Sequence, residues 1–204
     1  MALDEADLRS RKQQWTRAQI LDAAWDLARR DGLAVISLRE LAAAVGMRAP
    51  SLYHYFPSKN ALYDAMYADG MQQFNERLEA SRPGRDAVAT LRNRARSFVD
   101  AAVSDPARYE LLFHRPVPGF EPSPSHLAAA MSGLAKTRDI ATAAGIKGER
   151  AFDLFLATTR GLIAMQIANE PGGTRWTRLV DEAVTMFVAN YASPASTSRG
   201  PKHG

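Results

Sequence analysis

Six side chains that can contact a nucleic acid lie within the twelve residues from Arg48 to Lys59. Arginine, serine and histidine can reach the hydrogen-bonding atoms at base edges, and flanking tyrosine and lysine groups can bind phosphates. The six are Arg48, Ser51, Tyr53, His54, Tyr55 and Lys59. Such side chains read a DNA groove only when a short helix presents them together, so the neighbouring elements decide whether this chemistry is possible.

The residues before this segment are typical of a helix that ends in a tight turn. Ser37 and Glu40 have the spacing of a capping box, in which each side chain binds the backbone N–H of the other residue. We expect a helix that begins at residue 38 and stops at Gly46, and a short second helix at 50–56 whose first residue is proline. Helix, short turn and second helix form the helix-turn-helix pattern.

Apolar residues recur with a helical period along almost the whole chain, and no segment alternates for long enough to predict a strand. The predicted fold class is therefore all-α, with about nine helices. Ser58 and the Asp105-Pro106 pair are cap signals for later helices. We expect a flexible basic N-terminal arm at 1–15, a three-helix helix-turn-helix domain at 16–64, a larger C-terminal helical bundle at 65–192 and a disordered tail at 193–204.

The 204 residues carry a formal charge of +4, and the excess is concentrated near the N-terminus. Nine arginine and lysine residues oppose four acidic residues between Arg9 and Lys59, a pattern typical of a surface that binds a polyanion. The lack of cysteine excludes disulfides and thiolate chemistry. The first residues lack the apolar core of a secretory signal, and the most apolar stretch, 151–168, is too short and too charged for a membrane span. A cytoplasmic protein is expected.

The stretch from Leu38 to Leu62 closely resembles the TetR family of bacterial transcriptional regulators. The resemblance rests on LAAAVGM at 41–47, SLYHYF at 51–56 and KNAL at 59–62, and it extends over about the first 66 residues. It implies a homodimer whose short second helices enter successive major grooves of a pseudo-palindromic operator, and a C-terminal domain for dimerisation and for a small ligand. The implied function is that of a ligand-responsive repressor, with no cofactor.

The resemblance also implies DNA contacts at particular residues. Base contacts fall on Arg48, Ala49, Pro50, Ser51 and His54, and phosphate contacts fall on Thr16, Arg17, Ser37, Tyr53, Tyr55 and Lys59. Arg48 is the expected source of base selectivity, because a guanidinium can bind guanine through two hydrogen bonds. Ser37 can instead be only a helix cap, and Tyr55 can both pack and bind a phosphate. The spacing of Leu52 and Phe56 predicts that both lie in the core.

The C-terminal part contains candidate residues for an effector and for the dimer. Side chains that could line a ligand cavity are Phe98, Leu112, Phe113, Met131, Leu134, Phe152, Phe155 and Arg160. They suit a small apolar or amphipathic effector, although the apolar ones can simply form the core and the arginine can lie at the surface. Two helices with wide apolar faces, expected at 148–169 and 174–191, predict a homodimer joined through a four-helix bundle.

Two other functions remain open at this point. Glu110, His114 and His126 could assemble the metal site of an enzyme, but the chain lacks the usual nucleophile, phosphate-cradling and zinc-protease motifs. A DNA-binding protein without sequence preference is the second alternative, which the small net charge disfavours. We therefore expect a regulator, not an enzyme, that binds duplex DNA, an effector and a second copy of itself, without membrane contact.

Overall fold

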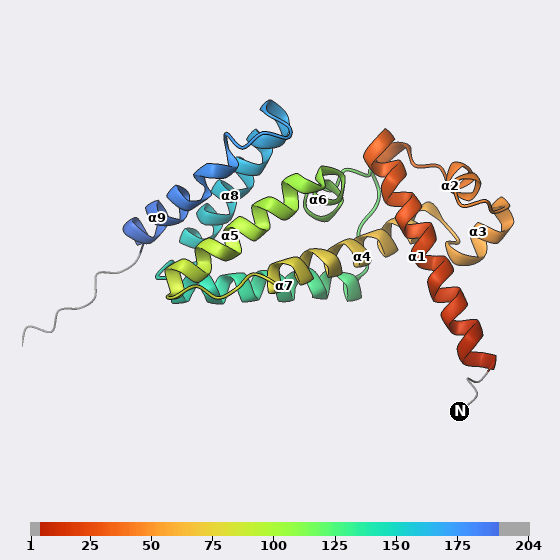
Figure 1. Cartoon of the computed structure of the whole chain (residues 1–204), viewed down its shortest axis with the longest axis horizontal. Helices are drawn as coiled ribbons and strands as arrows, with labels where there is room; N and C mark the ends of the chain where they lie inside the picture. The colour runs from red at the N-terminus through yellow and green to blue at the C-terminus, as the bar shows by residue number, and fades with distance from the viewer. Residues whose placement is uncertain (1–4, 192–204) are drawn as a thin grey trace, which may run out of the picture. The chain divides into compact units, whose positions relative to one another are not determined.

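The computed structural model describes residues 5–191, so the tail predicted at 193–204 lies outside the described part. The described residues form nine α-helices and two short 3₁₀ segments without a strand, which confirms the all-α prediction (Figure 1). The helices are α1 (Glu5–Asp31), α2 (Leu38–Ala44), α3 (Ala49–Tyr55), α4 (Lys59–Glu79), α5 (Ala87–Ser104), α6 (Pro106–Phe113), α7 (Pro124–Ala143), α8 (Glu149–Asn169) and α9 (Val180–Tyr191). The 3₁₀ segments are Leu33–Val35 and Thr177–Leu179.

The chain divides into two compact units. The first contains residues up to Ala80 together with 100–134, and the second contains residues 81–99 together with those from Ala135 on. The division differs from the predicted boundary at residue 64, because α4 and α6 pack with α1 inside the first unit. The helix-turn-helix is therefore one part of a larger packed body.

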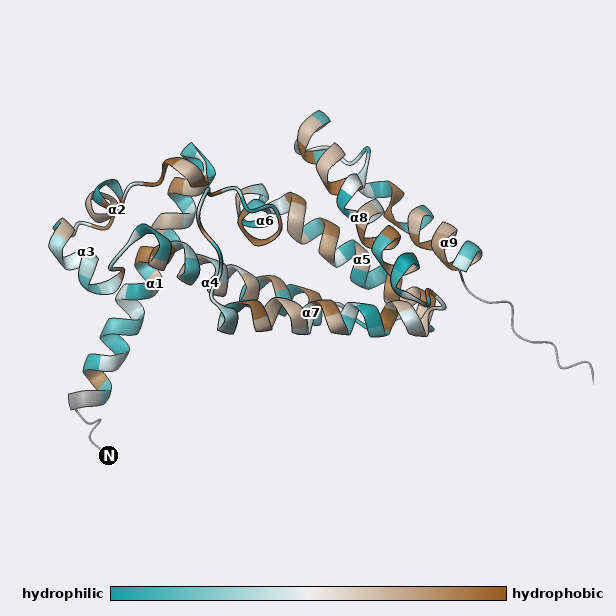
Figure 2. Cartoon of the chain, turned by 180° about the vertical axis from the view of Figure 1, so that it is seen from behind, coloured by the Kyte–Doolittle hydropathy of each residue, from teal (hydrophilic) through white to brown (hydrophobic). Residues whose placement is uncertain are grey.

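The first helix is longer than the sequence predicted. It begins at Glu5 rather than near Thr16, so the part of the expected flexible arm from residue 5 onward is helical. The first described side chain that is buried on this helix is Ile20, and the residues before it are mostly hydrophilic (Figure 2). A helix without an apolar side leaves no periodic signal in the sequence, which is why its start was missed.

The turn between α2 and α3 is a Schellman motif. The N–H of Met47 binds the carbonyl of Ala42 at 2.8 Å, and the N–H of Gly46 binds the carbonyl of Ala43 at 3.1 Å. Gly46 has a φ of +68°, a conformation that glycine adopts without steric cost. The predicted helix stop is confirmed, and α3 begins one residue earlier than expected, at Ala49.

The predicted helix caps have different outcomes. Ser58 Oγ accepts the N–H of the third residue after it at 3.1 Å, and Asp105 Oδ1 accepts the N–H of Arg108 at 3.2 Å, so both caps are confirmed. Ser37 precedes α2 with an extended backbone, but its side chain makes no cap hydrogen bond. The capping box predicted at Ser37 is therefore wrong.

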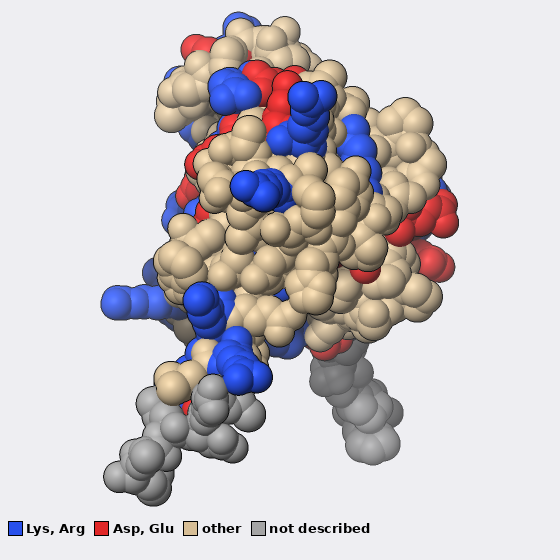
Figure 3. Space-filling view, turned by 90° about the vertical axis from the view of Figure 1, so that its right-hand side faces the viewer, with Lys and Arg blue, Asp and Glu red and all other residues tan. Residues whose placement is uncertain are grey.

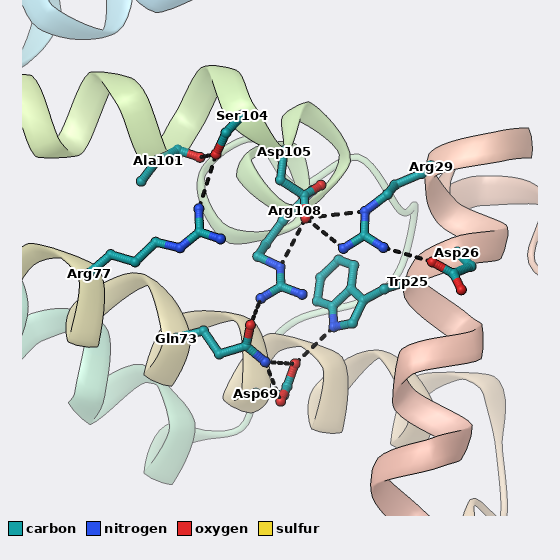
Figure 4. Close-up of polar contacts among 10 residues, drawn as sticks. All are labelled: Trp25, Asp26, Arg29, Asp69, Gln73, Arg77, Ala101, Ser104, Asp105 and Arg108. Atoms are coloured by element: carbon teal, nitrogen blue, oxygen red, sulfur yellow. Dashed lines mark hydrogen bonds and ion pairs between the residues drawn. The ribbon is translucent and has the colours of Figure 1, made fainter.

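A polar network holds α1 against α4 and α6 (Figure 4). Trp25 Nε1 of α1 donates to Asp69 Oδ2 of α4 at 2.9 Å. Gln73 donates to the same carboxylate, and its own carbonyl oxygen accepts from Arg108 of α6. The Arg108 guanidinium lies 4.6 Å from the centroid of the Trp25 ring. Gly70 leaves room for this stack, because a Cβ there would lie 3.1 Å from the indole.

Asp105 joins α1 and α6 within the same network. Its carboxylate pairs with Arg29 of α1 at 2.8 Å and with Arg108 at 3.3 Å, and the same side chain caps α6. Burial lowers the pKa of Arg108, and the negative charge of Asp105 offsets part of this effect. A largely buried cation is costly without a partner, so the position of Arg108 depends on Asp105.

The second unit is built around the contact of α8 with α9. The rings of Phe155 and Phe187 meet edge to face at 5.7 Å, and Arg96 Nε of α5 donates to Asp181 of α9 at 2.7 Å. By length and composition alone, α8 could cross a membrane. Its residues Phe152, Phe155 and Ile163 are buried inside this unit.

We expect Asp105→Ala to lower the free energy of unfolding by about 3–5 kcal/mol, because it removes a cap and leaves Arg108 without its carboxylate. The matched control is Asp86→Ala. Asp86 caps α5 through the N–H of Ala89 at 2.7 Å and pairs with the exposed Arg85, so its loss should lower the free energy of unfolding by clearly less. Urea unfolding of both variants measures the difference, and equal losses would contradict the role of Asp105.

Candidate nucleic-acid interface

One side of α3 is buried and the other is exposed and polar. Leu52 and Phe56 have no exposed surface, which confirms that both are core residues. The exposed residues are Arg48, Pro50, Ser51, Tyr53 and His54, whereas Ala49 and Tyr55 are half-buried. Four of the five residues predicted to meet bases are therefore exposed, and the fifth, Ala49, is half-buried.

Arg17 of α1 fixes the end of α3. Its Nη1 donates to the carbonyl oxygen of Tyr55 at 3.1 Å, and its guanidinium lies 4.4 Å from the centroid of the Phe56 ring. The last carbonyls of a helix lack partners within the helix, so this side chain acts as a C-terminal cap. Arg17 was predicted only as a phosphate contact, and the structure gives it a positioning role as well.

Lys59 fixes the segment between α1 and α2. Its Nζ donates to the carbonyl of Ala34 at 2.8 Å and lies 5.6 Å from the centroid of the Tyr63 ring. The Tyr63 hydroxyl donates to the carbonyl of Leu33 at 2.5 Å. Burial raises the pKa of Tyr63 to about 12, so this hydroxyl stays protonated at neutral pH. The beginning of α4 thereby holds the 3₁₀ segment in place.

All eleven residues predicted to contact DNA lie in the first unit. Thr16 and Ser37 are half-buried, and the hydroxyl of Thr16 donates to the carbonyl of Lys12 at 2.9 Å. The rings of His54 and Tyr55 meet edge to face at 5.8 Å. Contact of these residues with DNA stays a prediction.

Basic side chains are spread unevenly over the side of the molecule that carries α1, α2 and α3. Figure 3 shows that side, with Lys and Arg side chains toward the lower left and others near the top, where acidic side chains lie beside them. Arg9, Arg11, Lys12 and Arg17 are all exposed on the first half of α1. Such a charge distribution favours the approach of a phosphate backbone.

The predicted effector residues do not all belong to one unit. Leu112, Phe113, Met131 and Leu134 lie in the first unit, and Phe98, Phe152, Phe155 and Arg160 lie in the second. Phe113 contacts the ring of Phe74 at 5.2 Å, as Phe155 contacts Phe187, and such contacts are those of core residues. Arg160 is exposed, so burial does not force it to find an anion.

A hollow of about 540 Å³ lies elsewhere in the first unit. Its lining residues are Asn60, Arg115, Val117, Pro118, Gly119, Phe120 and Glu121. It shares no residue with the predicted effector set. The rival metal site gains no support, because His126 pairs with Asp64 at 3.0 Å and the described residues contain no group of three potential metal ligands.

The comparisons with known proteins address the same region. Residues 20–66 match the family model of the bacterial regulatory proteins of the tetR family. The chain is 30% identical over 146 residues to the HTH-type transcriptional regulator Rv1816 of Mycobacterium tuberculosis, which covers 66% of this chain and 61% of that protein. The match assigns residues 20–66 to the tetR family of bacterial regulatory proteins. The chain is also 30% identical over 110 residues to the HTH-type transcriptional repressor KstR of Rhodococcus jostii, which covers 54% of this chain and 51% of that repressor.

Solved structures of low identity share the fold of this chain. A protein of unknown function from Rhodococcus sp. RHA1 matches with a TM-score of 0.74 at 24% identity, over 87% of this chain and 95% of its own. A tetR-family transcriptional regulator from Streptomyces coelicolor matches with a TM-score of 0.67 at 19% identity, over 86% and 80%. The chain spans about three fifths of the length of the curated relatives that head the comparison.

Proposed function

We propose that this chain is a homodimeric transcriptional repressor that binds a pseudo-palindromic DNA operator and responds to a small apolar or amphipathic effector. The proposal rests on the two different sides of α3. Leu52 and Phe56 are buried, and the polar residues are exposed. Regulation of transcription requires access to DNA, so the proposal places the protein in the bacterial cytoplasm. It does not require an enzymatic activity or a cofactor.

Arg48 is the residue that we assign to base selectivity. It is the N-cap of α3, its backbone is extended with a ψ of 145°, and its side chain is exposed. A recognition helix approaches base edges with its N-terminal residues, where a guanidinium can bind guanine through two hydrogen bonds. Lys59 lies beyond the other end of α3, where a phosphate contact would position the helix without reading sequence.

We expect Arg48→Ala to weaken binding to a selected operator by about 1–3 kcal/mol and to relax selectivity at one base position. Lys59→Ala should weaken binding to all sequences alike. It should also lower the free energy of unfolding by about 1 kcal/mol through the lost bond to Ala34, whereas Arg48→Ala should not. Operators are first selected from random DNA, and affinities for operator and random duplexes are then compared with urea unfolding. Equal losses of Arg48→Ala on both DNAs would contradict the assignment.

The dimer is proposed to form through exposed side chains of α8 and α9. The predicted apolar face of α9 is largely used within the chain, because Val184 and Phe187 are buried. Large apolar side chains that stay exposed on the two helices are Leu154, Met165, Met186 and Tyr191. Leu154 and Met165 are eleven residues apart, about three helical turns, so they lie on the same side of α8. An isologous contact would cover this side in both copies.

We expect the double substitution Leu154→Asp with Met186→Asp to convert a dimer into a folded monomer, because it places charges in the proposed interface. Met131→Asp is the control, since Met131 is 62% exposed on α7 in the first unit. Light scattering measures the mass of each variant, and circular dichroism checks the helix content. A double variant that remains dimeric, or a wild-type protein that is monomeric at every concentration, would contradict this interface.

The effector response is proposed as a coupling between two binding events. An effector that lowers operator affinity about 5–150-fold corresponds to a coupling of about 1–3 kcal/mol, and DNA must lower effector affinity by the same factor. A thermal-shift screen of amphipathic compounds identifies a binder, and titrations with and without operator measure both factors. A compound that stabilises the protein but leaves operator affinity unchanged would contradict regulation by that compound.

A further inference from the structure

We propose that the hollow beside the connection from α6 to α7 binds a small zwitterion with an apolar side chain, of the class of an apolar α-amino acid. The inference rests on the proposed function, because it supplies a site and a chemical class for the effector. The α6–α7 connection is defined as residues 114–123, which run beside the start of α4 in the first unit (Figure 1). The volume of the hollow, about 540 Å³, lies in the range of roughly 300–1,000 Å³ found for small-molecule sites.

The α6–α7 connection is fastened to α4. The backbone N–H of Ser123 donates to Asp64 Oδ1 at 2.8 Å, and Nδ1 of His126 lies 3.0 Å from the other oxygen of this carboxylate. The ring of Phe120 lies 5.6 Å from the ring of Tyr63, measured between centroids. The walls of the hollow are therefore held in place by the fold, and a site that is already in place loses less conformational entropy when a ligand binds.

The apolar part of the lining is a tight turn within the α6–α7 connection. Val117 and Phe120 contribute to the lining, and the N–H of Phe120 donates to the carbonyl oxygen of Val117 at 3.2 Å. Gly119 has a φ of +74°, which lets the chain make this turn without steric cost. Pro118 is exposed at the same turn. These residues offer apolar surface to a ligand beside the polar groups that would orient it.

The polar part of the lining contains two opposite charges. Arg115 and Glu121 come from the two ends of the connection, and Nη1 of the arginine lies 3.6 Å from Oε1 of the glutamate. Their side chains are 81% and 77% exposed, so this ion pair contributes little to stability and can be exchanged for ligand groups at little cost. Arg115 also has a φ of +48°, a left-handed conformation that is uncommon for residues other than glycine and that clusters at ligand sites.

The two charges favour a zwitterion over a ligand with a single charge. An organic anion would pair with Arg115 but would meet the carboxylate of Glu121, and an organic cation would meet the reverse arrangement. An α-amino acid carries its carboxylate and its ammonium group on one carbon, so it can pair with both side chains. The amide of Asn60, on the α4 side of the hollow, can donate to the carboxylate or accept from the ammonium group.

The hollow lies against the part of α4 that supports the helix-turn-helix. Asn60 is the second residue of α4, and Tyr63 follows one turn later. The ring of Tyr63 meets Phe120 of the α6–α7 connection, and its hydroxyl donates to the carbonyl oxygen of Leu33, between α1 and α2. A ligand that shifts the connection would therefore act on the segment that precedes α2, and operator affinity should change with it.

The test uses three probe compounds that share one aromatic ring and differ in charge. L-phenylalanine is a zwitterion, 3-phenylpropionate lacks the ammonium group, and phenethylamine lacks the carboxylate. Titration calorimetry with the full chain should show that L-phenylalanine binds about tenfold or more tightly than either analogue, because each analogue loses one charged hydrogen bond and gains one repulsion. L-phenylalanine should also change the affinity for the selected operator about fivefold or more.

Two variants assign the charges to their residues. Arg115→Gln and Glu121→Gln should each weaken the binding of L-phenylalanine about tenfold. In addition, Glu121→Gln should tighten the binding of 3-phenylpropionate, and Arg115→Gln should tighten that of phenethylamine, because each variant removes a repulsion. A general loss of structure would not reverse sign in this way. The matched control is Arg85→Gln, which changes an exposed arginine that pairs with Asp86 at 3.4 Å in the second unit and should bind all three probes as the wild type does.

The outcomes separate this inference from the proposed function. A lack of binding of L-phenylalanine at millimolar concentration, or equal binding by the wild type and both hollow variants, would overturn the site and leave operator recognition intact. Tightest binding of 3-phenylpropionate would overturn the zwitterion in favour of an organic anion. Binding without a change in operator affinity would overturn the effector role. A protein that selects no DNA sequence but binds L-phenylalanine through Arg115 and Glu121 would overturn the proposed function and leave the ligand site.

Discussion

Docking of α1 onto α4 and α6 is the interaction on which the first unit depends. Trp25 carries the contact, because its indole N–H binds Asp69 of α4 and its ring receives the Arg108 guanidinium of α6. About two turns nearer its N-terminus, the same helix caps α3 through Arg17. The helix α1 therefore holds the end of α3, and α1 is itself held by its contacts with α4 and α6. Asp105 matters for this reason, since it holds both Arg29 and Arg108.

The side chains on and around α3 differ in whether they pack in the core or stay exposed. Leu52 and Phe56 supply only packing, and Arg48 supplies no described packing contact because it is exposed. Arg17 and Lys59, which are proposed to contact phosphates, each bind a backbone carbonyl of the protein and keep further N–H donors. Cations that are already held in place lose less conformational entropy when they bind a ligand.

Local features of this chain could be predicted from the sequence, and distant contacts could not. The caps at Ser58 and Asp105 and the stop at Gly46 depend on a few consecutive residues, so their residue types were sufficient. The capping box at Ser37 had the right residue types, but the hydroxyl does not make the bond.

Contacts between residues that are far apart along the chain leave no pattern in the sequence. Arg17 meets Tyr55 38 positions away, and Arg29 meets Asp105 76 positions away. The start of α1 was missed because no described side chain before Ile20 is buried, and the mostly polar residues there leave no wide apolar side in the sequence. The proposed DNA surface was thus predicted from residue types, whereas the contacts that position α3 required the structure.

The central claim is that α3 reads a DNA sequence, and the ratio of affinities for a selected operator and a scrambled duplex of equal length tests it most directly. Measured at physiological salt with the full chain, the account predicts a ratio of about 10³ or more, because base-edge contacts add to the phosphate contacts that any sequence provides. Equal affinities for the two duplexes would contradict sequence recognition by α3 and leave only a basic surface.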